Sequence, residues 1–358
     1  MKHFKFYSKH DILSLTKVRR FETKVGERIQ PLSENGEWPE VLQQSSANYV
    51  LLGIPEDIGV RANYGRGGAD SNWLPFLNSF LNTQSNDFFT GENILLLGHF
   101  DFGDVKYLIE NNAYSPDEKI DAYRHAVNLI DEEVEALLKS IAAAGKIPII
   151  IGGGHNNAYP IIKGVSKGLL KADKVPLAQI NCINLDAHTD YRPLEGRHSG
   201  NAFRYAETDG FMGKYAVVGL HENYIPQNVL MDLNNNPFIQ YTSYEEIFVH
   251  ERKNFIQAVA HATGFTEDTF TGIELDMDVV ENVLSSACSP SGLSVLHARQ
   301  YLNFTATDCK VAYLHICEGA AQIADDGAKN EEAGKLISFF VTDFVKANSN
   351  VIPPNSIK

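Results

Sequence analysis

Short runs of apolar residues, nearly uninterrupted by polar ones, recur along the chain. The runs are NYVLLGI (48–54), NILLLG (93–98), IPIIIGG (147–153), INCINLD (180–186), YAVVGL (215–220), FTGIELDMD (270–278) and VAYLHIC (311–317). Runs of this kind are typical of strands that are buried on both faces of a parallel sheet. The pattern therefore predicts a strand at each run.

Helical periodicity fills several of the intervals between these runs. The clearest case is residues 120–146, where apolar residues recur at helical spacing and Gly145 provides a C-terminal stop. Further helices are expected near 158–170, 244–262 and 328–347. Alternating strands and helices predict an α/β fold of three layers, α/β/α, with a central, mostly parallel sheet. Residues 1–46 are mixed and polar and are interpreted as an N-terminal extension, and residues 47–358 as a single domain.

Composition narrows the class of protein. The chain has 358 residues with 44% hydrophobic and 21% charged residues, which is ordinary for a soluble globular protein with a sizeable core. A net charge of −14 makes a nucleic-acid partner unfavourable. No apolar run approaches the roughly 20 residues that span a bilayer, so no membrane partner is expected. The first residues, MKHFKFYSKHDILSL, lack the apolar core of a secretory signal.

The cysteines indicate a reducing compartment. Cys182, Cys288, Cys309 and Cys317 form no C-x-x-C pair, and three of them lie in or beside apolar segments. We interpret them as free thiols and expect a cytoplasmic protein.

The end of one predicted strand carries a concentration of metal-ligand side chains. In INLDAHTDYRP (183–193), Asp186, His188 and Asp190 follow an apolar run at two-residue intervals. In extended backbone such positions share one face, so the three side chains would project into one volume. The alternative is a polar loop with each group hydrogen-bonded or solvated, because short motifs have a real false-positive rate.

Two other strand ends supply similar groups. GGGH (152–155) places His155 after a run of glycines that allows a sharp turn off the strand. Asp276 and Asp278 end another apolar run, where two carboxylates would repel each other unless a cation lies between them. Seen alone, His155 is better explained as a hydrogen-bonded loop residue than as a ligand, and the two aspartates are equally well explained as exposed carboxylates at a strand margin.

Taken together, the three motifs predict a binuclear metal centre, because ligands in such sheets gather at the carboxyl ends of strands. Six ligands rich in carboxylate suit two divalent ions about 3.5–4 Å apart. Mixed oxygen and imidazole ligation favours manganese, with iron, nickel or zinc as alternatives. A water between two cations loses a proton near neutral pH, which is the chemistry of a hydrolase.

The motifs GGGH, D-A-H-x-D and D-x-D, in this order, resemble those of the arginase/agmatinase family of ureohydrolases. The resemblance runs from about residue 48 to the end and implies a parallel sheet flanked by helices and two Mn²⁺ ions. It also implies a small amidine or guanidino substrate and assembly as a trimer or hexamer. The metal ligands that it implies are His155, Asp186, His188, Asp190, Asp276 and Asp278.

Within this family, two segments are most similar to formimidoylglutamases. In HSGNAFRYA, Phe203 stands where arginases have a histidine, and GVRANYGRGGA (59–69) is similar to a formimidoylglutamase segment. The substrate of these enzymes has two carboxylates, which arginine can bind bidentately. The expected substrate-binding residues are Arg61, Asn63, Arg66, Asn201 and Arg204, with Arg204 the best single choice; each arginine has a surface or structural ion pair as its alternative.

The resemblance also implies a catalytic group. Glu318, in LHICEGA, matches a family glutamate that holds the amidine or guanidine cation. Its alternative is a helix-start glutamate. Because residue 203 is not a histidine, the group that protonates the leaving group is unassigned, and His198, nearby in sequence, and Asp190 are the candidates. One departure is the segment after the D-x-D, where Val279, Val280, Glu281 and Asn282 replace the usual acid and proline, which leaves the shape of that loop undetermined.

We therefore expect a binuclear manganese hydrolase of linear amidine C–N bonds. The expected reaction converts N-formimidoyl-L-glutamate and water to L-glutamate and formamide, as in histidine breakdown. The alternatives are hydrolysis of arginine, agmatine or guanidinobutyrate, or a catalytically silent binding protein on the same fold.

Overall fold

The computed structural model describes residues 2–33, 37–321 and 327–349. These residues form a ten-stranded sheet with helices around it. The strand order is β1-β4-β3-β5-β10-β9-β6-β7-β8, with β2 pairing to β4. The strands are β1 (Phe4–Phe6), β2 (Gln30–Pro31), β3 (Tyr49–Gly53), β4 (Ile94–Phe100), β5 (Ile147–Ile151), β6 (Ile180–Leu185), β7 (Met212–Leu220), β8 (Ile239–Ser243), β9 (Thr271–Asp276) and β10 (Val311–Cys317). Every pairing is parallel except that of β1 with β4.

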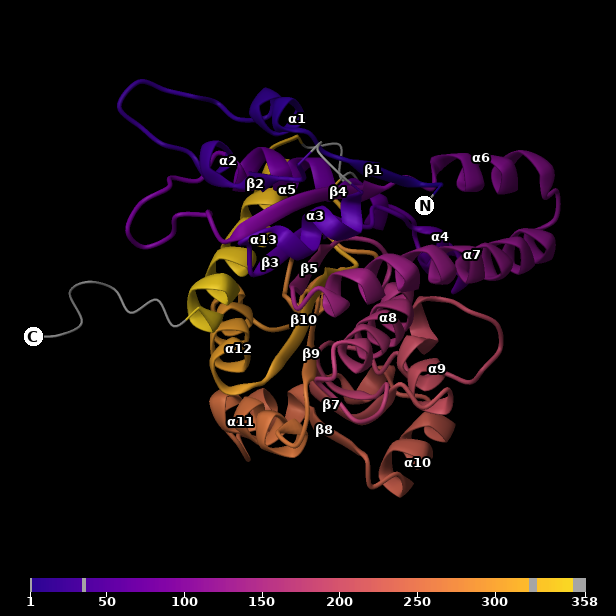
Figure 1. The fold of residues 1–358 in the computed structure, drawn as a ribbon. Helices are drawn as coiled ribbons and strands as arrows, with labels where there is room; N and C mark the ends of the chain where they lie inside the picture. The colour runs from indigo at the N-terminus through magenta and orange to yellow at the C-terminus, as the bar shows by residue number, and fades with distance from the viewer. Residues whose placement is uncertain (1, 34–36, 322–326, 350–358) are drawn as a thin grey trace, which may run out of the picture.

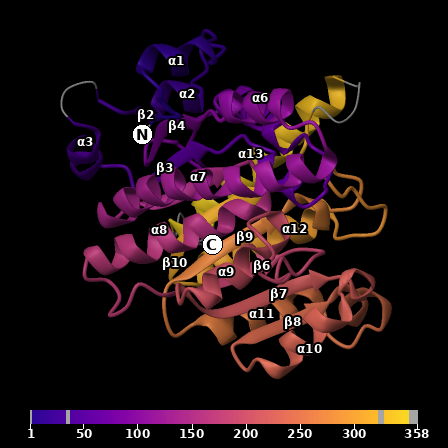
Figure 2. The same ribbon diagram turned by 90° about the vertical axis from the view of Figure 1, so that its right-hand side faces the viewer.

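Helices cover both faces of this sheet. They are α1 (Lys9–Ser14), α2 (Val25–Arg28), α3 (Trp38–Gln44), α4 (Ile58–Ala62), α5 (Trp73–Phe80), α6 (Gly103–Asn112), α7 (Pro116–Ala143), α8 (Ala158–Lys171), α9 (Ala202–Thr208), α10 (Gln227–Asn235), α11 (Phe255–Thr266), α12 (Val295–Asp308) and α13 (Gly327–Asn348). In Figure 1, α11, α12 and α13 lie on one side of the sheet and α7, α8 and α9 on the other. Figure 2 looks onto the α7 and α8 side, where the two helices run across the front of the sheet. The three-layer α/β/α fold predicted from the sequence is confirmed.

Alternating strand residues build two separate cores. In β3, Val50 and Leu52 pack into the core beneath α7 and α8, whereas Tyr49 and Leu51 pack into the core beneath α5, α12 and α13. All four residues are buried. A strand covered on both faces gains from apolar side chains at every position, which explains why the strands read as continuous apolar runs.

The predicted strands all occur near their expected positions, and the sequence reading missed three others. The missed strands β1, β2 and β8 are short or lie at an end of the sheet, where the pattern is more polar. Two of them, β1 and β2, belong to residues 1–46, so this segment adds strands to the sheet beside β4. The division at residue 46 stays a prediction. Among the described residues no helix is both long and apolar enough to cross a membrane.

The strand order decides where the motifs meet. β5, β10, β9 and β6 are consecutive neighbours in the sheet and run parallel. Their carboxyl ends, which carry His155, Glu318, Asp276 and Asp186 in turn, therefore lie side by side at one edge.

Candidate metal centre and active site

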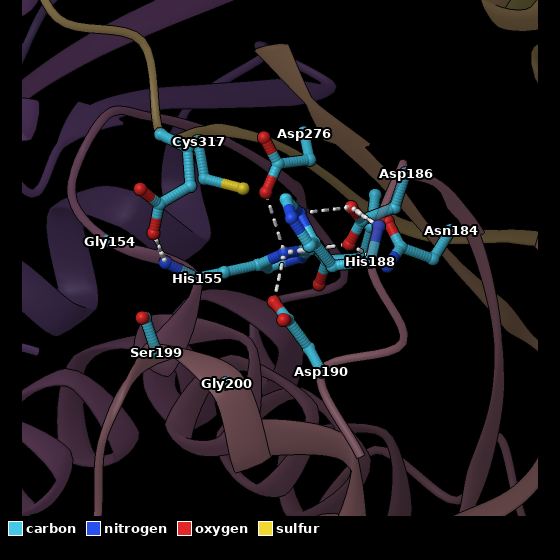
Figure 3. A network of polar contacts seen from close by, with 12 residues as sticks. Gly154, His155, Asn184, Asp186, His188, Asp190, Ser199, Gly200, Asp276 and Cys317 are labelled. Carbon is cyan, nitrogen blue, oxygen red and sulfur yellow. Dashed lines mark hydrogen bonds and ion pairs between the residues drawn. The ribbon is translucent and has the colours of Figure 1, made fainter. Parts of the chain in front are cut away.

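A buried histidine and three aspartates form the first ligand group. His155 Nδ1 lies 3.3 Å from Asp186 Oδ2, 2.8 Å from Asp190 Oδ2 and 3.2 Å from Asp276 Oδ2. One ligand atom from each of the four residues lies within 4.8 Å of the others. Figure 3 shows the Asp186, Asp190 and Asp276 carboxylates gathered around the His155 imidazole.

A second ligand group adjoins the first and shares one carboxylate with it. It consists of Asp186, His188 and Asp278. His188 Nδ1 lies 3.1 Å from Asp278 Oδ2 and 3.7 Å from Asp186 Oδ1. The two oxygens of Asp186 therefore face different histidines. The two groups are therefore adjacent candidate cation sites that share one carboxylate, and together they contain all six residues expected from the sequence as ligands.

The backbone reasoning for Asp186, His188 and Asp190 was wrong, although the three side chains do converge. β6 ends at Leu185, and Asp190 has a φ of 44°, in the left-handed region rather than the extended one. The His188 N–H donates to Asp186 Oδ1 at 2.7 Å, which closes a tight turn directly after the strand. The convergence thus arises from a folded loop, where a two-residue spacing does not by itself place side chains on one face.

The charge and hydrogen bonding of these residues fit bound cations. His155 Nδ1 and Asp278 Oδ1 are buried and lack an aligned hydrogen-bond partner among the described residues. Burial, then the Asp278 and Asp186 carboxylates, raise the pKa of Asp276 well above its usual range. Burial raises the pKa of Asp190 to about 6, and Asp186 adds to the rise. Crowded buried carboxylates of this kind are stabilised by a cation between them, and carboxylate with imidazole suits a divalent metal.

A cavity of about 210 Å³ opens above the ligand groups. Its wall includes His188, Asp190, Asp276, Asp278 and Glu318. Glu318 is 4% exposed and has a φ of 59°. Its Oε1 accepts a hydrogen bond from the His155 N–H at 2.8 Å, and its Oε2 accepts a hydrogen bond from Ser286 Oγ at 2.5 Å. Burial raises the pKa of Glu318 to about 7. The cavity thus combines a candidate metal floor with a carboxylate that is fixed at both oxygens.

The predicted substrate residues lie at different places. Asn63 lines the cavity and donates to Ser199 Oγ at 3.4 Å. Arg61, Arg66 and Arg204 are not among the lining residues. Arg61 pairs with Asp57 at 3.0 Å and Glu110 at 3.5 Å. Arg66 is exposed on the loop after α4.

Arg204, in α9, is held by an aromatic ring and an acidic side chain. Its guanidinium carbon lies 4.0 Å from the centre of the Tyr191 ring, and the guanidinium pairs with Asp232. These contacts favour the structural alternative for Arg204. Its role in substrate binding stays a prediction.

The other predicted residues of this segment, His198 and Asn201, make their hydrogen bonds to neighbouring residues of the same loop. His198 Nδ1 accepts from the Gly200 N–H at 3.1 Å, and His198 Nε2 lies 3.2 Å from Glu195 Oε1. Burial lowers the pKa of His198 to about 4. Asn201 accepts from the His198 N–H at 3.1 Å and donates to the Gly196 carbonyl at 2.7 Å. Neither residue lines the cavity, whereas Asp190 does.

Arg192, Tyr224 and Ser286 are among the lining residues that the sequence reading missed. Arg192 follows the ligand Asp190 by two residues, which is the signal that could have identified it. Tyr224 stacks on the His188 ring with centroids 5.1 Å apart. Ser286 lies in the segment after the D-x-D, where the family pattern is not followed, so no motif indicated its hydrogen bond to Glu318.

Comparison with known proteins establishes the family. A model of the arginase family matches residues 47–338. The chain belongs to the arginase family. This arginase-family chain is 25% identical over 272 residues to a formimidoylglutamase of Streptococcus gordonii, covering 72% of this chain and 71% of the relative. It is 28% identical over 177 residues to a formimidoylglutamase of Aromatoleum aromaticum, covering 48% of this chain and about half of the relative's length, 47%.

Solved structures agree with this family's fold. Formimidoylglutamase from Bacillus subtilis has a TM-score of 0.71 at 17% identity, covering 94% of this chain and 95% of that one. Trypanosoma cruzi formiminoglutamase with Mn²⁺ has a TM-score of 0.65 at 19% identity, covering 90% and 98%. The chain is accordingly an arginase-family metallohydrolase with a buried candidate metal centre.

Proposed function

We propose that this chain hydrolyses N-formimidoyl-L-glutamate to L-glutamate and formamide with two Mn²⁺ ions. The observation that carries the proposal is the pair of adjacent ligand groups that share Asp186 at the floor of a cavity. The formimidoylglutamase relatives support the substrate, and the Mn²⁺ in the Trypanosoma cruzi structure supports the metal.

The ligands divide between two positions. His155, Asp190 and Asp276 would hold one ion, His188 and Asp278 the other, and Asp186 would bridge them. When bound, two divalent cations in such a centre supply an activated water nucleophile near neutral pH and stabilise the charge that develops in the transition state.

Glu318 would orient the amidine. Its carboxylate lines the cavity beside Asp276 and Asp278 and is fixed by the His155 N–H and Ser286 Oγ. A formamidinium group presents N–H donors in a plane, and an ionised carboxylate accepts them with charge-assisted hydrogen bonds. Holding that plane would orient the amidine carbon toward the candidate metal ligands.

Arg192 and Asn63 would recognise the substrate's glutamate moiety. Both line the cavity, and the Arg192 side chain is 47% exposed, with Glu195 at 3.0 Å as its ion-pair partner. An exposed ion pair contributes little free energy, so a substrate carboxylate can replace Glu195 at small cost. A guanidinium can bind that carboxylate through two parallel hydrogen bonds.

The proton balance assigns a role to Asp190. Water adds to the amidine carbon, the bond from that carbon to the glutamate nitrogen breaks, and the leaving amine must gain a proton. The Phe203 ring lies nearly perpendicular to the His155 imidazole, with centroids 5.1 Å apart. The position where arginases have a histidine therefore carries no proton-carrying side chain. Asp190 lines the cavity and His198 does not, so Asp190 is the better placed proton carrier.

A product assay on a substrate panel tests this proposal. The Mn²⁺-loaded chain is incubated with formimidoylglutamate, arginine, agmatine and guanidinobutyrate, and formamide, glutamate and urea are measured, with a chelator-treated sample as control. We expect that formimidoylglutamate is the only compound of the panel that is hydrolysed, that it gives equal amounts of formamide and glutamate, and that the chelator-treated sample gives neither. Urea from a guanidino compound at a higher kcat/KM would overturn the substrate, and no hydrolysis of any compound would favour a silent binding protein.

A further inference from the structure

Three adjacent strands carry stacked layers of polar side chains beneath the metal centre. In the register of the sheet, Asp276 pairs with Cys317, and two residues earlier Glu274 pairs with His315 and with Asn184. Because residues two apart in a strand share a face, the layer directly below the ligands consists of Asn184, Glu274 and His315. The family motifs do not include this layer.

Glu274 is the charged centre of the layer and is fully buried. Its Oε1 accepts a hydrogen bond from the Tyr313 hydroxyl at 2.7 Å, and its Oε2 lies 2.6 Å from His315 Nδ1. The same Oε2 lies 3.5 Å from His155 Nε2. This nitrogen is on the opposite side of the imidazole from the three aspartates, and it has no aligned hydrogen-bond partner among the described residues.

The backbone of β9 is adapted to this arrangement. Gly272 precedes Glu274 by two residues and pairs with Tyr313. A Cβ at Gly272 would lie 2.3 Å from the Tyr313 ring. The missing side chain therefore makes room for the ring that reaches Glu274, which indicates a site built around this carboxylate rather than a carboxylate that is buried by chance.

We propose that Glu274 is a positioning residue that orients His155 as a metal ligand. This inference rests on the two-metal centre of the proposed function. A histidine that binds a metal through one ring nitrogen donates its other N–H, and a carboxylate acceptor fixes the tautomer and increases the basicity of the ligand nitrogen. Glu274 thus directs Nδ1 toward the aspartates, and Tyr313 and His315 hold the carboxylate in place.

A separate cation site is the alternative for these side chains. His155, Glu274, His315 and Cys317 also place ligand atoms within 4.8 Å of one another. However, Glu274 and His315 already satisfy each other at 2.6 Å, and a cation between them would break that contact. The geometry therefore favours the positioning role.

Equilibrium binding of Mn²⁺ to the full chain tests the inference without relying on turnover. Free Mn²⁺ is measured by electron paramagnetic resonance as the metal is titrated into the wild type, Glu274→Gln, Tyr313→Phe and Asp131→Asn. Asp131 is a matched control because it is a buried carboxylate that pairs with Arg197 and belongs to neither ligand group. We expect two equivalents in the wild type. In Glu274→Gln, one equivalent should bind about ten- to a hundredfold more weakly, which is typical for the loss of a partner of a metal ligand.

Tyr313→Phe keeps the ring and removes one hydrogen bond to Glu274, so it should weaken the same equivalent by a smaller factor. It also provides the test if Glu274→Gln does not fold. Asp131→Asn should reduce stability and leave both affinities unchanged. Unchanged Mn²⁺ affinities in Glu274→Gln would overturn the inference; if Glu274→Gln does not fold, unchanged affinities in Tyr313→Phe would do so. An equal loss of affinity in Asp131→Asn, or a third equivalent of Mn²⁺ in the wild type, would also overturn it. Fewer than two equivalents in the wild type would instead contradict the proposed function.

Discussion

Asp186 lies between His155 and His188, with one carboxylate oxygen 3.3 Å from Nδ1 of the first and the other 3.7 Å from Nδ1 of the second. It is the only residue that both ligand groups of the described chain share. Asn184 Nδ2 donates to Asp186 Oδ2 at 2.8 Å, which steadies the carboxylate from below. The two candidate cation sites therefore share one side chain, which should couple them.

This coupling predicts different metal contents for two aspartate variants. Asp186→Asn should lose both metals, whereas Asp278→Asn should lose only the one at His188. Turnover should fall by several orders of magnitude in both, because activation of the water nucleophile depends on both cations. Elemental analysis of the folded, Mn²⁺-equilibrated proteins measures the content. Two retained metals in Asp186→Asn would contradict the bridging assignment.

Glu318 should act on the substrate and not on the metals. Its carboxylate is fixed by the His155 N–H and Ser286 Oγ but belongs to neither ligand group. Glu318→Gln should lower kcat/KM about ten- to a hundredfold, because a charge-assisted hydrogen bond contributes roughly 1.5–3 kcal/mol. Both Mn²⁺ ions should remain bound. Loss of a metal in this variant would show instead that Glu318 supports the centre itself.

Arg192 should bind the substrate, whereas Arg204 should have a structural role. Arg192→Lys should lower kcat/KM for formimidoylglutamate by about ten- to a hundredfold, since lysine cannot make the bidentate contact. Arg204→Lys serves as the matched comparison, because Arg204 is held by Tyr191 and Asp232. We expect it to lower the melting temperature more than the activity. Steady-state kinetics that show the reverse ranking would return the carboxylate-binding role to Arg204, as the sequence had suggested.

Glu56 should give the metal-free protein a pH-dependent stability. Burial raises the pKa of Glu56 to about 7, although hydrogen bonds from Gly59, Asn157 and Asn156 oppose the rise. A carboxyl group whose pKa is higher in the folded than in the unfolded chain stabilises the fold fully below the unfolded pKa. This contribution is lost as pH rises through the folded pKa. The free energy of unfolding contributed by Glu56 should therefore fall from about pH 5 to about pH 8.

Glu56→Gln should remove that contribution and flatten the profile, which denaturant unfolding in the presence of a chelator measures. Glu118→Gln is the control. Hydrogen bonds from the Ser115 and Tyr114 N–H groups lower the pKa of Glu118, so its contribution changes only at lower pH. Parallel profiles for the wild type and Glu56→Gln would contradict the expectation.

The fold and the candidate metal ligands were accessible from the sequence because they depend on local patterns. Buried parallel strands produce continuous apolar runs, and polar residues directly after such runs stand out. The loop that carries Asp190 was less predictable, since its left-handed φ of 44° is not encoded by a glycine. The convergence of Asp186, His188 and Asp190 was predicted from an extended backbone, whereas it arises from a folded loop.

The contacts across the sheet could not be predicted in the same way. Glu274 reads as one polar residue inside an apolar strand, and its partners Tyr313 and His315 come from a strand about 40 residues later, so only the register brings them together. Arg61 and Arg204 matched a family segment, but whether an arginine faces a cavity or a neighbouring acid depends on packing that a motif does not describe.

The most direct test of the two-metal centre is a crystal structure of the Mn²⁺-loaded chain with anomalous diffraction data collected at the manganese edge. We predict two anomalous peaks about 3.5–4 Å apart, with Asp186 between them, His155 on one and His188 on the other. A single peak, or a peak that Asp186 does not contact, would contradict the two-metal centre.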